Sequence, residues 1–102
     1  MSHASDVATW IRETEKLRVV SWTPSLEAER LIGIYEVAKR RILAGRFNGG
    51  NLSTDQQTGS LLVIYGPNAL AALDLQPESL RKTGERQWPG LRERIVKALK
   101  ET

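Results

Sequence analysis

The side chains in this sequence that could do chemistry are basic rather than catalytic. Lysine and arginine cluster near residue 40 and again in the C-terminal segment. Such side chains neutralise phosphates, and phosphate contacts supply most of the sequence-independent affinity of a protein for nucleic acid. The candidate nucleic-acid-binding residues are Lys39, Arg40, Arg41, Arg46, Arg81, Lys82, Arg86, Arg92, Arg94 and Lys97.

The basic excess is greatest at the C-terminal end. The net charge is +3, and residues 78–102 hold seven basic and four acidic side chains, against seven and six in residues 1–45. Two other interpretations of the C-terminal segment stay open: a solvated helix face and a site for an acidic protein partner. Glu93 precedes Lys97 by four residues, a spacing that allows an ion pair on a helix. The cluster near residue 40 spreads over roughly 200° of a helix surface, so it also suits the negative end of a helix dipole.

Residues for catalysis or metal binding are sparse. The only histidine is His3 and there is no cysteine, which removes a Ser-His pair, a thiol nucleophile and a histidine pair for a metal. The segment "GRFNGG" lacks the Lys-Ser/Thr ending of a phosphate-binding loop. Asp55 and Asp74 are isolated carboxylates, better explained as helix caps or solvated groups than as metal ligands. We therefore predict no enzymatic activity, no cofactor and no metal site.

The composition suits a globular protein. With 102 residues, of which 40% are hydrophobic and 26% charged, the chain fits one compact domain, which we place at residues 6–102 after a flexible tail at residues 1–5. No apolar run approaches the ~20 residues that cross a bilayer, and the first residues lack the pattern of a secretory signal. We expect a cytoplasmic protein with no membrane partner.

Two N-terminal helices are predicted to carry the first basic cluster. Apolar residues recur at helical spacing over residues 6–17, which predicts a first helix there. Thr23 followed by Pro24 is a helix start signal, because threonine caps free amides and proline suits the first helical position. The second helix should run from Pro24 to about Ala44.

The middle of the chain is ambiguous. Residues 48–59, "NGGNLSTDQQTG", read as a polar connector, and "SLLVIY" after them has the propensity of a short strand. Residues 66–68 favour a turn. Residues 69–75 contain strong helix formers, yet they also alternate as a strand does. The short turn and Pro77 favour a β-hairpin, which we predict.

The predicted fold class is α+β: two N-terminal helices, a small antiparallel β-hairpin or sheet in the middle, and a C-terminal helix. Pro77 and Gly84 should limit the segment between them to a short helical turn. Pro89 should open the last helix, which ends near Lys100. A sheet this small leaves an edge and an apolar surface to be covered, which makes a homodimer possible.

Two stretches resemble known DNA-binding families. Residues 34–54, "IYEVAKRRILAGRFNGGNLST", resemble the opening of GntR-type winged-helix regulators, in which a helix ends in an Ile/Leu-x-x-Gly-x-Phe/Leu pattern. Residues 59–80 with the last helix are similar to the C-terminal half of the YbaB/EbfC nucleoid-associated proteins. The matching positions are Gly59, Val63, Gly66, Leu73, Leu75, Pro77 and Leu80. The second likeness implies a small dimer that binds DNA with little sequence preference. We assign the chain to neither family.

The function predicted from the sequence is that of a small non-enzymatic nucleic-acid-binding protein, with DNA as the favoured ligand. Its basic helix faces would grip phosphates, which sets affinity rather than sequence choice. The alternative is a protein-binding module, such as an adaptor, inhibitor or accessory subunit, that acts through an exposed apolar surface.

Overall fold

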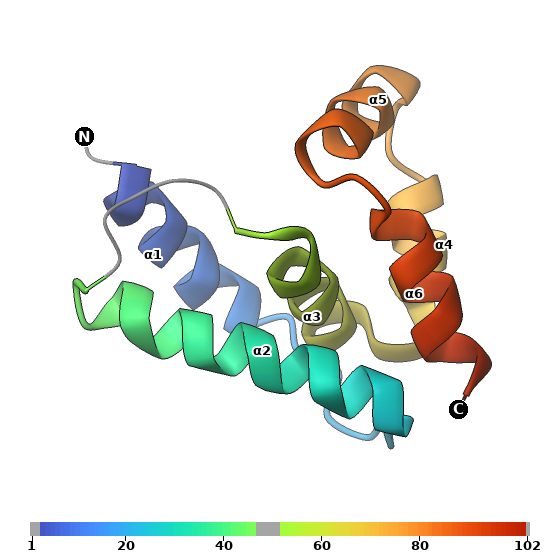
Figure 1. Ribbon diagram of the computed structural model, residues 1–102, viewed down its shortest axis with the longest axis horizontal. Coiled ribbons are helices and arrows are strands. Elements are labelled where there is room, and N and C mark those ends of the chain that lie inside the picture. The colour runs from blue at the N-terminus through green and yellow to red at the C-terminus, as the bar shows by residue number, and fades with distance from the viewer. Residues whose placement is uncertain (1–2, 47–51, 102) are drawn as a thin grey trace.

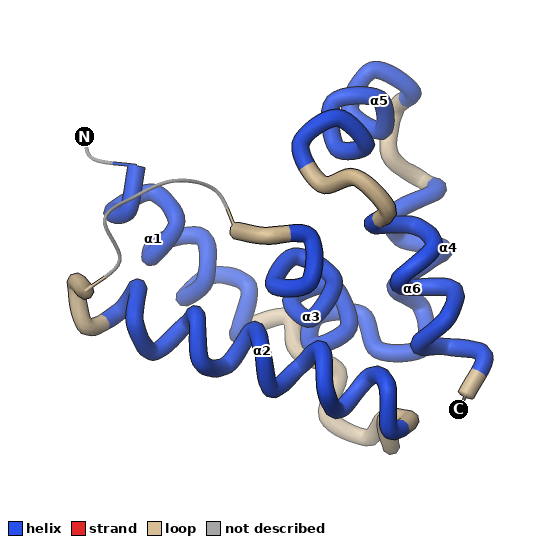
Figure 2. The backbone as a smooth tube through the Cα atoms, in the orientation of Figure 1, coloured by secondary structure: helices blue, strands red, loops and turns tan. Residues whose placement is uncertain are grey.

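The computed structural model describes residues 3–46 and 52–101, which form helices joined by short connections (Figure 1). Its elements are α1 (His3–Glu15), α2 (Leu26–Leu43), α3 (Thr54–Tyr65), the 3-10 helix η1 (Gly66–Asn68), α4 (Ala69–Asp74), α5 (Glu78–Gln87) and α6 (Leu91–Lys100). Figure 2 shows no strand among these residues. The predicted α+β fold, with its hairpin or sheet, is therefore wrong.

Helix α3 is the centre of the fold. Every residue from Gln57 to Ile64 is buried, so α3 has no solvent-facing side along this stretch. Leu61 and Leu62 join an apolar cluster with residues of α2, α4 and α6. Val63 belongs to a second cluster, which it forms with residues of α1 and α2. Helices α1, α2, α4 and α6 thus pack around α3, and both halves of the core depend on it.

The segment predicted as a strand forms the C-terminal half of α3. A capping box starts this helix: the Ser53 hydroxyl accepts a hydrogen bond from the Gln56 amide at 3.2 Å, and the Gln56 side-chain oxygen accepts one from the Ser53 amide at 2.8 Å. The helix therefore begins inside the predicted connector, of which residues 47–51 lie outside the described part of the chain. A short apolar run fits a buried helix as well as a buried strand. Burial on all sides here outweighs the β preference of Val63 and Ile64.

The buried hydroxyl groups of Thr58 and Ser60 in α3 keep their hydrogen bonds. The Thr58 hydroxyl donates to the Thr54 carbonyl oxygen at 2.7 Å, and the Ser60 hydroxyl donates to the Gln57 carbonyl oxygen at 2.8 Å. A buried hydroxyl without such a partner would oppose folding. These internal bonds let a helix with polar residues occupy the centre of the core.

Helices α2 and α3 approach each other closely at Gly59. A Cβ atom at this position would overlap the carbonyl oxygen of Leu31 and would lie 2.7 Å from the Cβ of Tyr35. Real Cβ atoms do not come this close to such atoms. Gly59 therefore sets the distance between the two helices.

Residues 66–74 turn the chain and continue as a helix, so the predicted hairpin turn and second strand are also wrong. Gly66 has φ of 53°, a conformation that favours glycine, and its amide caps α3 by donating to the Leu62 carbonyl. Ala69, the first residue of α4, is fully buried in the core. With the strand partner absent from the described residues, the strong helix propensity of alanine and leucine decides the conformation of α4.

The other predicted boundaries need smaller changes. Helix α1 starts at His3 rather than near Asp6, and α2 is capped by Ser25 rather than Thr23. The Ser25 hydroxyl accepts from the Ala28 amide at 3.1 Å and donates to the Ala98 carbonyl at 2.7 Å, which joins the start of α2 to the end of α6. No helix in the described residues is long and apolar enough to span a membrane.

The segment between Pro77 and Pro89 is a full helix rather than the short turn that was predicted. Pro77 directly precedes the first residue of α5, where its missing amide hydrogen breaks no helical bond. Gly84 lies inside the helix, which continues to Gln87. The predicted last helix is confirmed, with its first residue at Leu91.

Candidate nucleic-acid interface

The C-terminal basic residues lie on α5 and α6, which together with α4 form one end of the molecule (Figure 1). Helix α6 is amphipathic, with Leu91, Ile95 and Ala98 buried in the core. This pattern turns its basic side chains outward or toward the neighbouring helices. Helix α5 has no buried residue. Both helices therefore present basic side chains on the outer surface.

Two of the predicted residues hold helices together. A nitrogen of the Arg94 guanidinium lies 2.6 Å from a carboxylate oxygen of Asp55, and another lies 4.0 Å from Glu27. Arg92 forms an ion pair with Asp74. These pairs link α6 to α2, α3 and α4. The charges of Arg94 and Arg92 are therefore largely matched by carboxylates of the same chain.

The remaining C-terminal candidates keep their charge available. Lys82 lies 3.3 Å from Glu78, but the two side chains are 69% and 72% exposed, and such surface pairs contribute at most about 1 kcal/mol. Within the described part of the chain, no ion pair is formed by Arg81, Arg86, Lys97 or Lys100. These cations can therefore meet an anionic partner without first breaking an internal pair.

The Lys39–Arg46 cluster does not lie on the same surface as the basic residues of α5 and α6. It lies at the C-terminal end of α2, at the opposite end of the molecule from α5 (Figure 1). The Lys39 ammonium is 3.0 Å from Glu15 and 2.7 Å from Glu36. Partial burial alone would lower the pKa of Lys39, but hydrogen bonds and charge from the two glutamates outweigh burial and raise it. Lys39 is therefore an internal ion-pair residue.

The arginines beside Lys39 remain at the surface. Arg40, Arg41 and Arg46 are exposed and form no ion pair within the described residues. They are separated from α5 and α6 by the width of the core. The two basic clusters found in the sequence are thus two separate surfaces, of which the C-terminal one carries more unpaired charge on adjoining helices.

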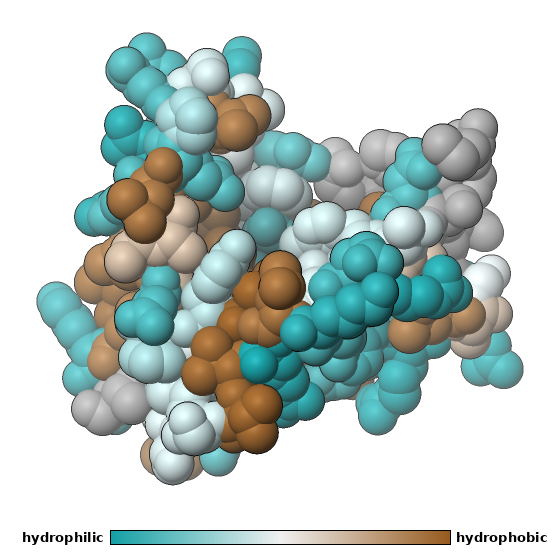
Figure 3. Space-filling view, turned by 180° about the vertical axis from the view of Figure 1, so that it is seen from behind, coloured by the Kyte–Doolittle hydropathy of each residue, from teal (hydrophilic) through white to brown (hydrophobic). Residues whose placement is uncertain are grey.

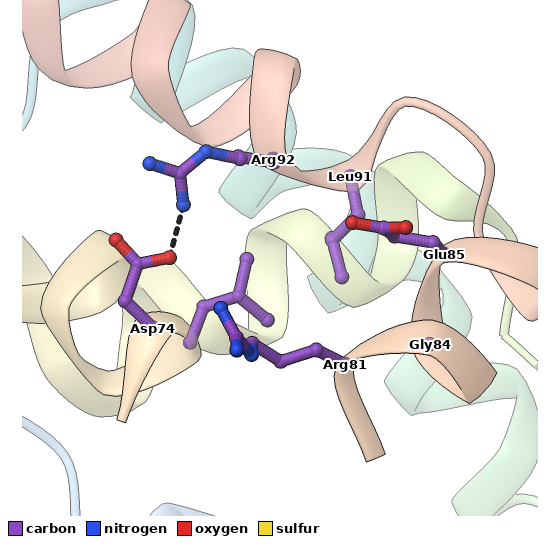
Figure 4. A pocket seen from close by; sticks show the side chains of 7 residues that line it. Asp74, Arg81, Gly84, Glu85, Leu91 and Arg92 are labelled. Atoms are coloured by element: carbon purple, nitrogen blue, oxygen red, sulfur yellow. Dashed lines mark hydrogen bonds and ion pairs between the residues drawn. The ribbon is translucent and has the colours of Figure 1, made fainter. Parts of the chain in front are cut away.

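A pocket of about 450 Å³ lies where α4, α5 and α6 meet (Figure 4). The Arg81 and Glu85 side chains reach into it from α5, and the Arg92–Asp74 ion pair closes its other side. Leu91, from the start of α6, supplies part of an apolar wall. The pocket thus combines one unpaired guanidinium with one unpaired carboxylate within the described residues.

A shallow groove of about 320 Å³ follows the exposed face of α6. Its lining residues are Arg92, Glu93, Val96, Lys97 and Lys100. Arg92 also lines the pocket between α4, α5 and α6, so the two hollows adjoin. The predicted ion pair between Glu93 and Lys97 does not form, although both residues are described. The ammonium groups of α6 therefore stay exposed along the groove.

Sequence reasoning missed the carboxylates that form ion pairs with two of the candidate arginines and so leave the other cations unpaired. Asp55 and Asp74 were interpreted as caps or solvated groups, yet each pairs with an arginine of α6. Such pairs join residues far apart in the chain, so no local spacing could reveal them. The full length of α5 could have been found, because its basic side chains recur at helical spacing on both sides of Gly84.

The described residues contain no group of three side chains that could hold a metal ion. His3 is the first residue of α1, and nothing is described of its side chain. The chain matches no protein-family model, and searches of curated proteins and of solved structures return no significant match. The strand and turn that carry the likeness to YbaB/EbfC proteins are helical here, in α3 and α4.

Proposed function

We propose that this protein is a cytoplasmic, non-enzymatic nucleic-acid-binding protein that grips phosphates with α5 and α6. The observation that carries the proposal is the set of unpaired cations on these adjoining helices. Arg81, which is exposed although it lines the pocket, and Arg86 belong to α5, and Lys97 and Lys100 belong to α6. Side chains of this kind release counterions from nucleic acid when they neutralise its phosphates.

The ion-pair pattern supports the choice of this end of the molecule. Carboxylates of α2, α3 and α4 neutralise Arg94 and Arg92 of α6. Arg86, Lys97 and Lys100 form no ion pair within the described residues. A solvated helix face would show the same exposure, so the proposal must be tested by binding.

Salt dependence gives the test. Four phosphate contacts predict that affinity falls about 100-fold between 50 and 200 mM salt, since each contact contributes about 0.9 to the slope of log K against log salt. Fluorescence anisotropy with a labelled 30-base-pair DNA duplex measures both affinity and slope. Replacing Lys97 and Lys100 by alanine should weaken binding and reduce the slope by about 2.

The matched control replaces Arg40 and Arg41 by alanine. This variant loses the same charge at the opposite end of the molecule, and it should retain the wild-type slope. Absence of binding to duplex or single-stranded DNA and RNA at 50 mM salt would refute the proposed function. An equal loss of affinity in both double variants would show that only the net charge matters.

A protein-binding function is the second candidate, because one apolar surface remains open. Val20 and Leu26 are 94% and 82% exposed. Val20 borders a hollow of about 290 Å³ whose lining includes Trp22 and Ile32. Figure 3 shows apolar side chains across the middle of the face seen from behind. Stable capture of one partner after nuclease treatment, lost in the Val20→Asp variant, together with no nucleic-acid binding, would favour this function.

A further inference from the structure

Helix α5 differs from the other α-helices of the described chain because it buries none of its residues. Its ten residues project at one end of the molecule (Figure 1). An isolated helix of this length is marginal in water, and folding gains little apolar burial from α5 itself. The helix is nevertheless anchored at its end, because the Trp88 indole nitrogen donates a hydrogen bond to the Leu52 carbonyl oxygen at 2.7 Å.

The two faces of α5 have different surroundings. Arg81, Gly84 and Glu85 line the pocket toward α4 and α6, so this face points inward (Figure 4). Residues at spacing i, i+3, i+4 and i+7 share one helix face. The face directed away from the pocket consists of Ser79, Lys82, Thr83 and Arg86. All four residues are exposed.

The outward face contains hydrogen-bonding and cationic groups and no carboxylate. Lys82 pairs only with the exposed Glu78 at the edge of this face. The Thr83 hydroxyl donates to the Ser79 carbonyl at 3.0 Å, which fixes the threonine side chain on the helix. Arg86 is unpaired within the described residues. Lysine, arginine, serine and threonine are side chains that contact base edges and phosphates in DNA complexes.

The connection between α4 and α5 is short, as it is in helix-turn-helix DNA-binding proteins. Only residues 75–77 separate α4 from α5. A connection of three or four residues also joins the two helices of a helix-turn-helix, whose second helix enters the major groove of DNA. A helix with its side chains is about 10–12 Å wide, and the major groove of B-form DNA is about 12 Å wide.

We propose that α5 enters the major groove of double-stranded DNA with Ser79, Lys82, Thr83 and Arg86 toward the base edges. This inference rests on the proposed nucleic-acid-binding function and adds which helix reads the duplex and from which groove. Lys97 and Lys100 of α6 then contact backbone phosphates beside that groove. Double-stranded RNA is excluded as the ligand of this face, because its major groove is too narrow and deep for a helix to read.

The test measures binding of the full chain to a labelled duplex of random 30-base-pair DNA at 50 mM salt. Arg86→Ala should weaken binding about tenfold, whereas Arg40→Ala, which removes one exposed arginine at the far end, should change it less than twofold. Methyl green, which occupies the major groove, should displace the protein from the duplex. Netropsin, which occupies the minor groove, should not displace it. Circular dichroism of each variant checks that the helices are retained.

The outcomes separate this inference from the function on which it rests. Displacement by methyl green together with a selective loss in Arg86→Ala supports the insertion of α5. Displacement by netropsin alone, equal effects of Arg86→Ala and Arg40→Ala, or binding only to single strands overturns the inference while nucleic-acid binding stands. No binding to any DNA or RNA overturns both.

Discussion

The contact between α2 and α3 at Gly59 allows a sharp test of the fold. Replacing Gly59 by alanine adds one methyl group that would overlap the Leu31 carbonyl oxygen and lie 2.7 Å from the Cβ of Tyr35. Neither neighbour can move alone, since one is helix backbone and the other is the root of a fully buried side chain. The variant can fold only if α2 and α3 move apart.

The size of the effect follows from the displacement. To reach an ordinary contact distance of 3.4 Å, the new Cβ at position 59 and the Cβ of Tyr35 must move apart by about 0.7 Å. The Leu31 carbonyl oxygen must move by more. Because α3 joins both apolar clusters, this shift loosens packing along its whole length. Overpacking a core costs about 3 kcal/mol in such tight cases, while alanine gains about 1 kcal/mol of helix propensity over glycine. We expect Gly59→Ala to lower the free energy of unfolding by about 2 kcal/mol.

Gly33→Ala is the matched control, because Gly33 lies inside α2 with nothing within 4 Å of its added Cβ. This variant makes the same chemical change and should raise the free energy of unfolding by up to about 1 kcal/mol. Urea denaturation followed by circular dichroism measures both variants. If Gly59→Ala is as stable as Gly33→Ala, the close approach of α2 and α3 described above is wrong.

Three further variants and conditions test other parts of the structure. Gly84→Ala meets no atom closer than 4.0 Å, so it should stabilise α5 by about 0.5–1 kcal/mol and slow hydrogen exchange of its amides. Tyr35→Phe removes a buried hydroxyl that has no hydrogen-bond partner among the described residues, so unfolding in urea should show equal or higher stability. Burial, with Glu15 and Glu36, raises the pKa of Tyr35, and these two glutamates also raise the pKa of Lys39. The unfolded chain therefore loses these protons first, and stability should fall as pH rises above about 10, less steeply in the Tyr35→Phe variant.

The helices at the two ends of the chain could be predicted from the sequence, but its middle could not. Apolar periodicity identified α1, α2 and α6 because each has one buried face. Helix α3 is buried all round, so its sequence has no helical periodicity to detect. The sequence feature that indicates α3 is the pair Ser53 and Gln56, which forms a capping box. This pair lies within the segment that we predict as a connector. The strand predicted for residues 60–65, the C-terminal half of α3, needs a partner, and residues 69–75 were the nearest segment that alternates as a strand does.

The candidate site was predictable as a set of residue types but not as a surface. The arginines and lysines in residues 78–102 were identified from charge alone, and all seven lie on α5 and α6. Lys39 was included for the same reason, although Glu15 from another helix and Glu36 neutralise it. Contacts between helices decide whether a cation is available, and such contacts are fixed only by the packing of the whole chain.

The position of each carboxylate relative to the core explains why the free charge lies where it does. Asp55, at the start of α3, is held near α6 by the packing of the two helices, so it meets Arg94. Asp74, at the end of α4, meets Arg92 in the same way. Lys97 and Lys100 of α6 form no ion pair within the described residues. The packing that fixes α6 therefore uses Arg92 and Arg94 for ion pairs between helices and leaves Lys97 and Lys100, with Arg86 of α5, unpaired within the described residues.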